Sequence, residues 1–76
     1  MRDGQRRKFR VFGIELLVVC EQGRWVPYYP GADGKRRPAR DIVIPPGITE
    51  AQLPEYLGDL MHEHANPRFP DVEVID

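Results

Sequence analysis

The residues most suggestive of chemistry in this chain are His62, Glu63 and His64, which follow one another near its C-terminal end. Zinc proteases place two histidines four positions apart on one face of a helix and use the glutamate beside the first as a base. Here the position four after His62 is Asn66, so the second histidine is missing. Asp59 has helical spacing to His62, but one carboxylate–imidazole pair is more typical of helix-end interactions than of a closed metal site. We therefore expect no bound metal.

Nucleophilic catalysis is equally unsupported by the residue types present. The single cysteine, Cys20, lies in the most apolar stretch with no histidine near it in the sequence, whereas a reactive thiolate needs a neighbouring cation or base. A buried cysteine usually acts as a small apolar filler. Serine is absent from the chain, which excludes a serine-based triad. The sequence therefore predicts a protein that is not an enzyme, with no catalytic residue and no cofactor.

The most pronounced surface feature is a basic loop between two apolar runs. Its four cations are Lys35, Arg36, Arg37 and Arg40. They could contact phosphates, and the nearby Tyr28 and Tyr29 could supply stacking faces for bases. However, nucleic-acid-binding domains are usually basic overall, whereas this chain has a net charge of −1 and a pI of about 6.1. A solvated loop, or one that pairs with the acidic helix, accounts for the same residues.

Aromatic side chains suggest a second kind of surface. Trp25, Tyr28 and Tyr29 lie close together in the sequence, and a small domain often leaves such a cluster partly exposed for a partner. The leading hypothesis is a non-enzymatic binding or regulatory module that acts through a protein partner or as a homodimer. The alternative is nucleic-acid or phosphate binding through the basic loop at 35–40. An enzyme built on the acids and histidines of 59–63 has the least support, because no orienting network completes it.

Charge is distributed unevenly along the chain. Residues 1–40 contain ten Lys and Arg against four Asp and Glu, a balance of +6, whereas residues 41–76 contain one against eight, a balance of −7. Such asymmetry can indicate an acidic or nucleic-acid partner for the basic half. We expect instead that the two halves face one another in the fold.

The predicted location is the cytoplasm. A secreted domain of this size usually carries several disulfides, and a single cysteine allows none within the chain. The basic start followed by the apolar run Val11–Cys20 imitates a signal peptide, but Gly13 and Glu15 interrupt the run and no cleavage site follows it. No apolar run approaches the roughly 18 residues of a membrane span.

Patterns along the chain predict four strands and a helix within one domain. Residues 1–7 are expected to be a disordered tail, and residues 8–76 a single domain. Alternating apolar residues predict strands at 8–12, 14–20, 24–29 and 42–44. Gln22-Gly23 has the spacing of a two-residue hairpin turn. The last residues, from Val72 to Ile75, are compatible with either a short strand or a tail.

A helix is predicted from Thr49 to Ala65. Thr49 with Gln52 forms a capping box, since each side chain can satisfy the other's backbone N–H. Pro54 indicates that the helix either kinks there or begins properly only at that residue. The residues expected to form its apolar stripe are Leu53, Tyr56, Leu57, Leu60, Met61 and His64. The fold class is therefore α+β, with an antiparallel three- to four-stranded β-meander and one C-terminal α-helix packed across one face.

Several short motifs in this chain also occur together in other proteins. They are Val11-Phe12-Gly13, Gly23-x-Trp25, the run from Asp33 to Pro38, the run from Ile42 to Pro46, and Tyr56-Leu57-x-Asp59-Leu60-x-His62-Glu63. In combination they resemble a family of small bacterial proteins of unknown function, over about residues 8–67. The resemblance implies a bacterial, cytoplasmic, single-domain protein, and it brings no activity to any residue of this chain.

Overall fold

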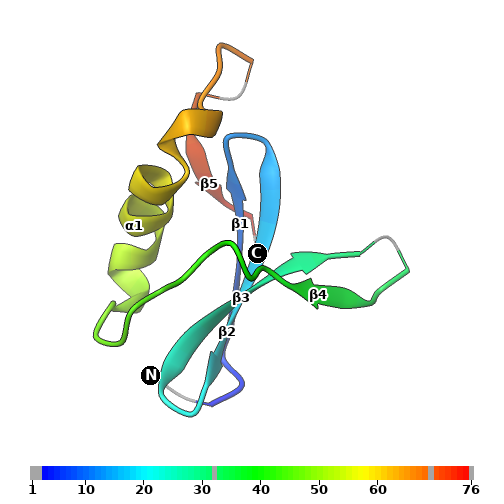
Figure 1. Cartoon of the computed structure of the whole chain (residues 1–76), viewed down its shortest axis with the longest axis vertical. Helices are drawn as coiled ribbons and strands as arrows, with labels where there is room; N and C mark the ends of the chain where they lie inside the picture. Colours follow the sequence, from blue (N-terminus) through cyan, green and yellow to red (C-terminus); the bar gives the residue numbers. More distant parts are fainter. Residues whose placement is uncertain (1–2, 32, 69, 76) are drawn as a thin grey trace.

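The computed structural model describes residues 3–31, 33–68 and 70–75 (Figure 1). The strands are β1 (Arg6–Val11), β2 (Ile14–Glu21), β3 (Arg24–Pro30), β4 (Arg36–Pro38) and β5 (Val72–Val74). Helix α1 (Leu53–Leu60) lies between two single 3₁₀ turns, Glu50–Gln52 and His62–His64. In this described part of the chain, no helix is both long and apolar enough to cross a membrane.

The five strands form one antiparallel sheet in the order β4-β3-β2-β1-β5, with α1 lying across one face (Figure 1). The predicted α+β class is confirmed. The sheet has five strands, one more than the predicted three to four, because the C-terminal residues form the short strand that was one of their two predicted alternatives. After α1 the chain returns to pair β5 with β1, so that Val74 lies opposite Phe9.

Two tight turns join the first three strands. Gln22 and Gly23 have φ of 54° and 74°, and positive φ at both central residues is the mark of a type I′ hairpin. The predicted turn is therefore confirmed. Phe12 and Gly13, with φ of 50° and 85°, make the same kind of turn between β1 and β2. Phe12 thus belongs to this turn and not to the predicted strand.

The N-terminal segment joins the sheet earlier than predicted. β1 begins at Arg6, inside the predicted tail of residues 1–7. The N–H of Gly4 donates to the carbonyl of Cys20 at 2.7 Å, and the N–H of Cys20 donates to the carbonyl of Gln5 at 2.8 Å. Residues 4–7 are therefore paired with β2. The remainder of the predicted tail, at residues 1 and 2, lies outside the described residues.

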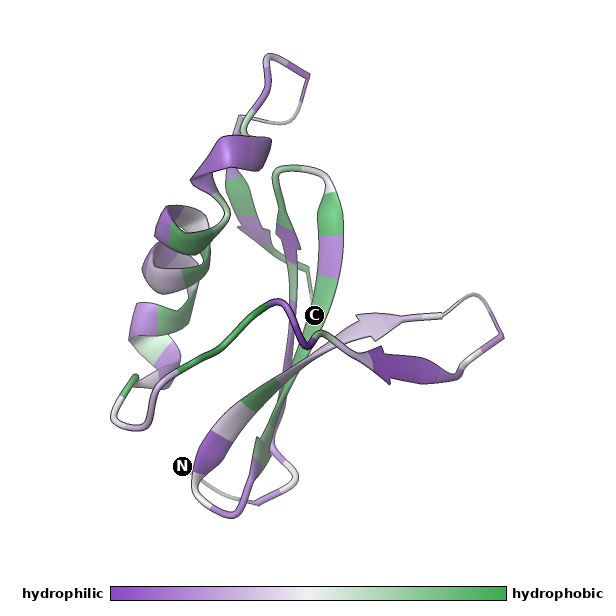
Figure 2. Ribbon diagram, in the orientation of Figure 1, coloured by the Kyte–Doolittle hydropathy of each residue, from purple (hydrophilic) through white to green (hydrophobic). Residues whose placement is uncertain are grey.

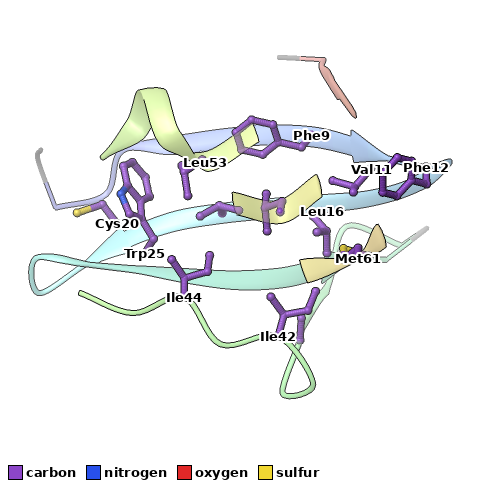
Figure 3. Packing of buried hydrophobic residues seen from close by; sticks show 13 residues of the cluster. Phe9, Val11, Phe12, Leu16, Cys20, Trp25, Ile42, Ile44, Leu53 and Met61 are labelled. Atoms are coloured by element: carbon purple, nitrogen blue, oxygen red, sulfur yellow. The ribbon is translucent and has the colours of Figure 1, made fainter. Parts of the chain in front are cut away.

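The prediction of a strand at 42–44 is wrong, and the fourth strand lies at 36–38, in the predicted loop. A turn closed by the N–H of Ile42 and the carbonyl of Ala39 (3.1 Å) redirects the chain after β4. Ile42 and Ile44 are buried and Val43 is 68% exposed, so side chains alternate as in a strand. The segment lies over the edge of the core, where its isoleucines pack without a ladder (Figure 3).

One hydrophobic cluster fills the space between the sheet and α1 (Figure 3). Its fully buried side chains are Phe9, Val11, Leu16, Val18, Cys20, Leu53 and Leu57. In Figure 2 the central strand β2 is mostly apolar, whereas β4 at the edge of the sheet is polar. Trp25 extends the core, and its indole N–H donates to the carbonyl of Ile48 at 3.0 Å, tying the loop before the helix to the sheet.

The predicted capping box is confirmed, but it caps the 3₁₀ turn Glu50–Gln52, and the α-helix itself begins at Leu53, beside Pro54, which is the second of the two predicted starts. The Gln52 N–H donates to the Thr49 hydroxyl (3.3 Å) and the Thr49 N–H donates to the Gln52 side chain (2.9 Å). Pro54 lies in the first turn of α1, where its missing N–H has no partner to lose. The α-helix ends at Leu60, five residues short of the prediction, because the backbone tightens into a 3₁₀ turn in which His64 bonds to Met61.

The predicted apolar stripe is only half correct. Leu53, Leu57 and Met61 are buried against the sheet, whereas Tyr56 is half-buried and Leu60 is 42% exposed. His64, beyond the end of α1, is also exposed. A helix of this length therefore presents a narrow apolar face and leaves the opposite side to solvent.

Candidate functional site

The face of the sheet that α1 does not cover is open. Residues directly opposite each other in an antiparallel ladder point to the same side. Phe9 marks the core side, so the neighbouring row formed by Lys8, Leu17, Tyr28 and Pro38 points away from α1. This row crosses four strands from β1 to β4.

Cations surround a hollow on this open face. Arg6 and Lys8 alternate along β1 and share its open side, and Arg36 reaches the same side from β4. With Leu17, they line a hollow of about 600 Å³. The β3–β4 hairpin closes it through Pro30, Gly31 and Gly34. We call this hollow the basic groove.

One of the three cations is held in place. The Arg36 guanidinium carbon lies 4.3 Å from the centroid of the Tyr28 ring, and its Nη2 lies 4.0 Å from Glu21 Oε2. The Tyr28 hydroxyl donates to the same carboxylate oxygen at 2.6 Å. This hydrogen bond is the main reason that the pKa of Tyr28 is raised above its usual value of 10.0, with smaller contributions from desolvation and the charge of Glu21. The phenol therefore stays protonated at neutral pH and anchors the wall of the groove.

The other two cations differ from Arg36 in their ion pairing, although Asp3 and Glu21 line a neighbouring hollow together with Arg6. The next cation on β1, Arg10, pairs with Glu73 at 3.1 Å and Glu15 at 3.7 Å. Arg6 and Lys8, by contrast, form no ion pair with any residue that the structure describes. An anion could therefore bind them without breaking an existing pair.

The predicted basic loop does not form one cluster. Arg36 lines the basic groove, but Arg37 lies opposite Tyr29 and so points to the other side of the sheet. Lys35 and Arg40 are exposed on either side of β4. The β3–β4 hairpin projects away from α1 (Figure 1), and among the described residues no ion pair joins these cations to that helix.

The expectation that the two charged halves face one another holds only in part. Arg7 lies 3.9 Å from Glu50, and Arg10 pairs with Glu73 of β5. The carboxylate beside Arg36 is Glu21, which belongs to the basic half itself. Much of the charge of each half is therefore displayed to solvent.

The structure also separates the three predicted aromatic residues. Trp25 is buried in the core and Tyr28 faces the open side of the sheet. Tyr29 points to the opposite side, where its hydroxyl donates to the Asp41 carboxylate at 2.9 Å. Burial and then this hydrogen bond raise the pKa of Tyr29. Of the three, only Tyr28 borders the basic groove.

The residues considered for catalysis stay apart. Over residues 3–31, 33–68 and 70–75, no three His, Cys, Asp or Glu side chains gather closely enough to hold a metal ion. His64 Nε2 lies 4.0 Å from Glu63 Oε1, at the protein surface. Cys20 is fully buried and packs in the hydrophobic core.

Arg6 and Lys8 are the site residues that sequence reasoning missed, because they were assigned to a tail and to the strand beside it. The signal was present: Arg6, Lys8 and Arg10 recur at every second position, the period that places side chains on one side of a strand. Extending the strand by two residues would have gathered all three on one face.

No curated protein and no solved structure matches this chain. Residues 6–76, nearly the whole chain, match the family described as a domain of unknown function, DUF7661. The expectation of a family of unknown function is thereby confirmed, and the chain belongs to the DUF7661 family.

Proposed function

We propose that this protein is a non-enzymatic binding module of the bacterial cytoplasm that holds an acidic partner protein on the open face of its sheet. The observation that carries the proposal is the basic groove, in which Arg6 and Lys8, which form no ion pair within the described part of the chain, line the hollow together with the apolar Leu17. A matching partner presents carboxylates to the cations and an apolar side chain to the floor between them. Such charge complementarity increases the association rate and the specificity for one partner more than it increases the affinity.

The third cation makes the groove partly preorganised. Stacking on Tyr28 and proximity to Glu21 restrict the Arg36 side chain before any partner arrives. Ordering a long side chain costs about 0.5–1.5 kcal/mol on binding, and a cation already held in place avoids part of that cost. Arg6 and Lys8 remain free to adjust to the partner.

The stacking of Arg36 on the Tyr28 ring is the one observation that favours the alternative function, nucleic-acid binding. Sheets that bind single strands stack several bases on exposed aromatic rings. Of Trp25, Tyr28 and Tyr29, only Tyr28 faces the groove, and Arg36 already lies over its ring. Phosphate contacts are therefore better supported than base stacking, and the acidic protein partner is the stronger proposal.

The test compares two neutralised variants that lose the same charge. Arg6→Gln with Lys8→Gln removes two cations of the groove, and Arg37→Gln with Arg40→Gln is the matched control outside it. Binding is measured by fluorescence anisotropy with labelled poly-L-glutamate and, separately, with a single-stranded oligonucleotide of similar length. We expect poly-L-glutamate to bind the wild type and the control equally and to lose most of its affinity for the groove variant.

Two results would count against the proposal. An equal loss of affinity for poly-L-glutamate in both variants would mean that binding depends on the overall charge of the protein and not on the basic groove. Tighter binding of the oligonucleotide than of poly-L-glutamate at physiological ionic strength, lost in the groove variant, would make nucleic acid the better assignment.

A further inference from the structure

We infer that the acidic partner is a second copy of this chain, whose outer helix surface docks in the basic groove. This inference rests on the proposed function and names the partner of the same site. It follows from the surface chemistry on the other side of the molecule. Glu55 and Asp59 are exposed on the side of α1 away from the sheet. Residues 41–67 contain no Lys or Arg, so no cation on this segment offsets the carboxylates.

The spacing of the charges matches on the two surfaces. Glu55 and Asp59 are four residues apart on a helix, which corresponds to a rise of about 6 Å along its axis. Arg6 and Lys8 are two residues apart on a strand, which corresponds to about 6.6 Å. Each carboxylate can therefore meet one cation when α1 lies roughly along β1 of the other copy.

The acidic surface is also shaped to receive a long cationic side chain. A hollow of about 200 Å³ beside α1 is lined by Glu55, Tyr56 and Asp59, with Ile48 and Gln52 at its border. An Arg6 or Lys8 side chain entering it would pair with one of the two carboxylates and lay its aliphatic stem against the Tyr56 ring. Leu60, the residue after Asp59, is 42% exposed and adds apolar surface to the same helix.

The two surfaces cannot meet within one molecule. The sheet lies between them: α1 lies across one face (Figure 1), and the cations of the basic groove point to the other. Because a different surface is used on each copy, the contact is head-to-tail, and such contacts build rings or open chains of subunits. Exposed charges dominate the contact, so it weakens as salt is added.

The test uses two variants, each lacking one of the two surfaces. Arg6→Gln with Lys8→Gln removes the groove cations, and Glu55→Gln with Asp59→Asn removes the helix carboxylates. Sedimentation velocity at low ionic strength is expected to show concentration-dependent association of the wild type and monomers of each variant alone. An equimolar mixture of the two variants should form a one-to-one complex, because that mixture retains one intact interface. Arg37→Gln with Arg40→Gln is the matched control and should associate as the wild type does.

Three results would overturn the inference: a monomeric wild type at all concentrations, self-association of either variant alone, or a mixture that fails to pair. All three are distinguishable from failure of the proposed function. If poly-L-glutamate still binds in a way that depends on Arg6 and Lys8, the groove binds an acidic partner that is not this chain. Circular dichroism of each variant checks that these surface changes leave the fold intact.

Discussion

Leu57 and Leu60 are only three positions apart on α1, yet the sheet buries the first completely and leaves the second 42% exposed. Leu57→Ala should lower the free energy of unfolding by about 2–5 kcal/mol, since it removes buried methyl groups and leaves a cavity. Leu60→Ala should change it by only about 0.5 kcal/mol, as is usual for surface positions. Urea unfolding of both variants measures the difference. Equal losses would mean that α1 is rotated relative to the arrangement described.

Tyr28 is the residue whose ionisation reports on the wall of the groove. Its pKa is raised above 10.0, chiefly by the hydrogen bond to Glu21. Because the folded-state pKa is the higher one, this contact stabilises the fold below about pH 10 and is lost as the pH rises through the folded-state value. In Glu21→Gln the Tyr28 transition should move down towards pH 10.

Ultraviolet absorbance titration measures this change, and Tyr28→Phe identifies which transition belongs to Tyr28. Tyr29 serves as an internal control, because its raised pKa comes from burial and Asp41. A Tyr28 transition that stays in place in Glu21→Gln would show that the carboxylate does not accept the phenolic proton in solution.

At the scale of elements, α1 and β5 meet at Gly58. A Cβ at this position would lie 3.1 Å from Cγ2 of Val72, which is closer than an ordinary contact. Gly58→Leu should therefore displace β5 while keeping a good helix-forming residue in α1. Native-state hydrogen exchange should become faster at the Ile75 amide, which donates to Lys8, and stay unchanged at the Cys20 amide, which donates to Gln5.

Gly58→Ala is the matched control for this prediction. Val72 lies in a three-residue edge strand and can move a few tenths of an ångström, while replacing a helical glycine gains up to about 1 kcal/mol. The alanine variant should therefore be as stable as the wild type or more so. If exchange rises together at both amides in Gly58→Leu, then β5 does not detach separately from the rest of the sheet.

The elements that the sequence predicted correctly are those governed by local chemistry. The Gln22-Gly23 turn and the Thr49 cap each depend on a few adjacent residues, and both are confirmed. The wrong predictions concern segments whose secondary structure depends on contacts with residues distant in the sequence. β4 is charged and lacks apolar alternation, so only its pairing with β3 makes it a strand. Residues 42–44 have the alternation of a strand but turn over the core edge.

The candidate site was only partly predictable for the same reason. Arg36 was recognised as a cation on a loop, but its role depends on the ladder that places it across the sheet from β1. Arg37, its neighbour in the chain, lies on the opposite side because side chains alternate along a strand. A run of basic residues in the sequence is therefore divided by the strand that it forms.

At the scale of the whole molecule, the charge asymmetry of +6 and −7 is arranged across the sheet. The basic half supplies the cations of the groove, and the acidic half supplies α1 on the opposite face. A net charge of −1 gives little long-range attraction for a polyanion, so binding depends on the groove itself. The number of cations that reach one ligand is therefore a measurable property of this arrangement.

The number of cations that contact an oligonucleotide can be determined from the salt dependence of its binding. Three of them, Arg6, Lys8 and Arg36, line the groove. For single strands the logarithm of the binding constant falls with the logarithm of salt concentration by about 0.7 per phosphate contacted, so a slope near −2 is expected. We expect the oligonucleotide to bind weakly and to be released near physiological ionic strength. Arg36→Gln should make the slope shallower by about 0.7, because one contact is lost. Arg37→Gln should leave it unchanged, since that side chain faces the other side of the sheet. Anisotropy titrations over a range of salt concentrations give the slopes, and equal effects of the two variants would show that the whole basic loop contacts the strand.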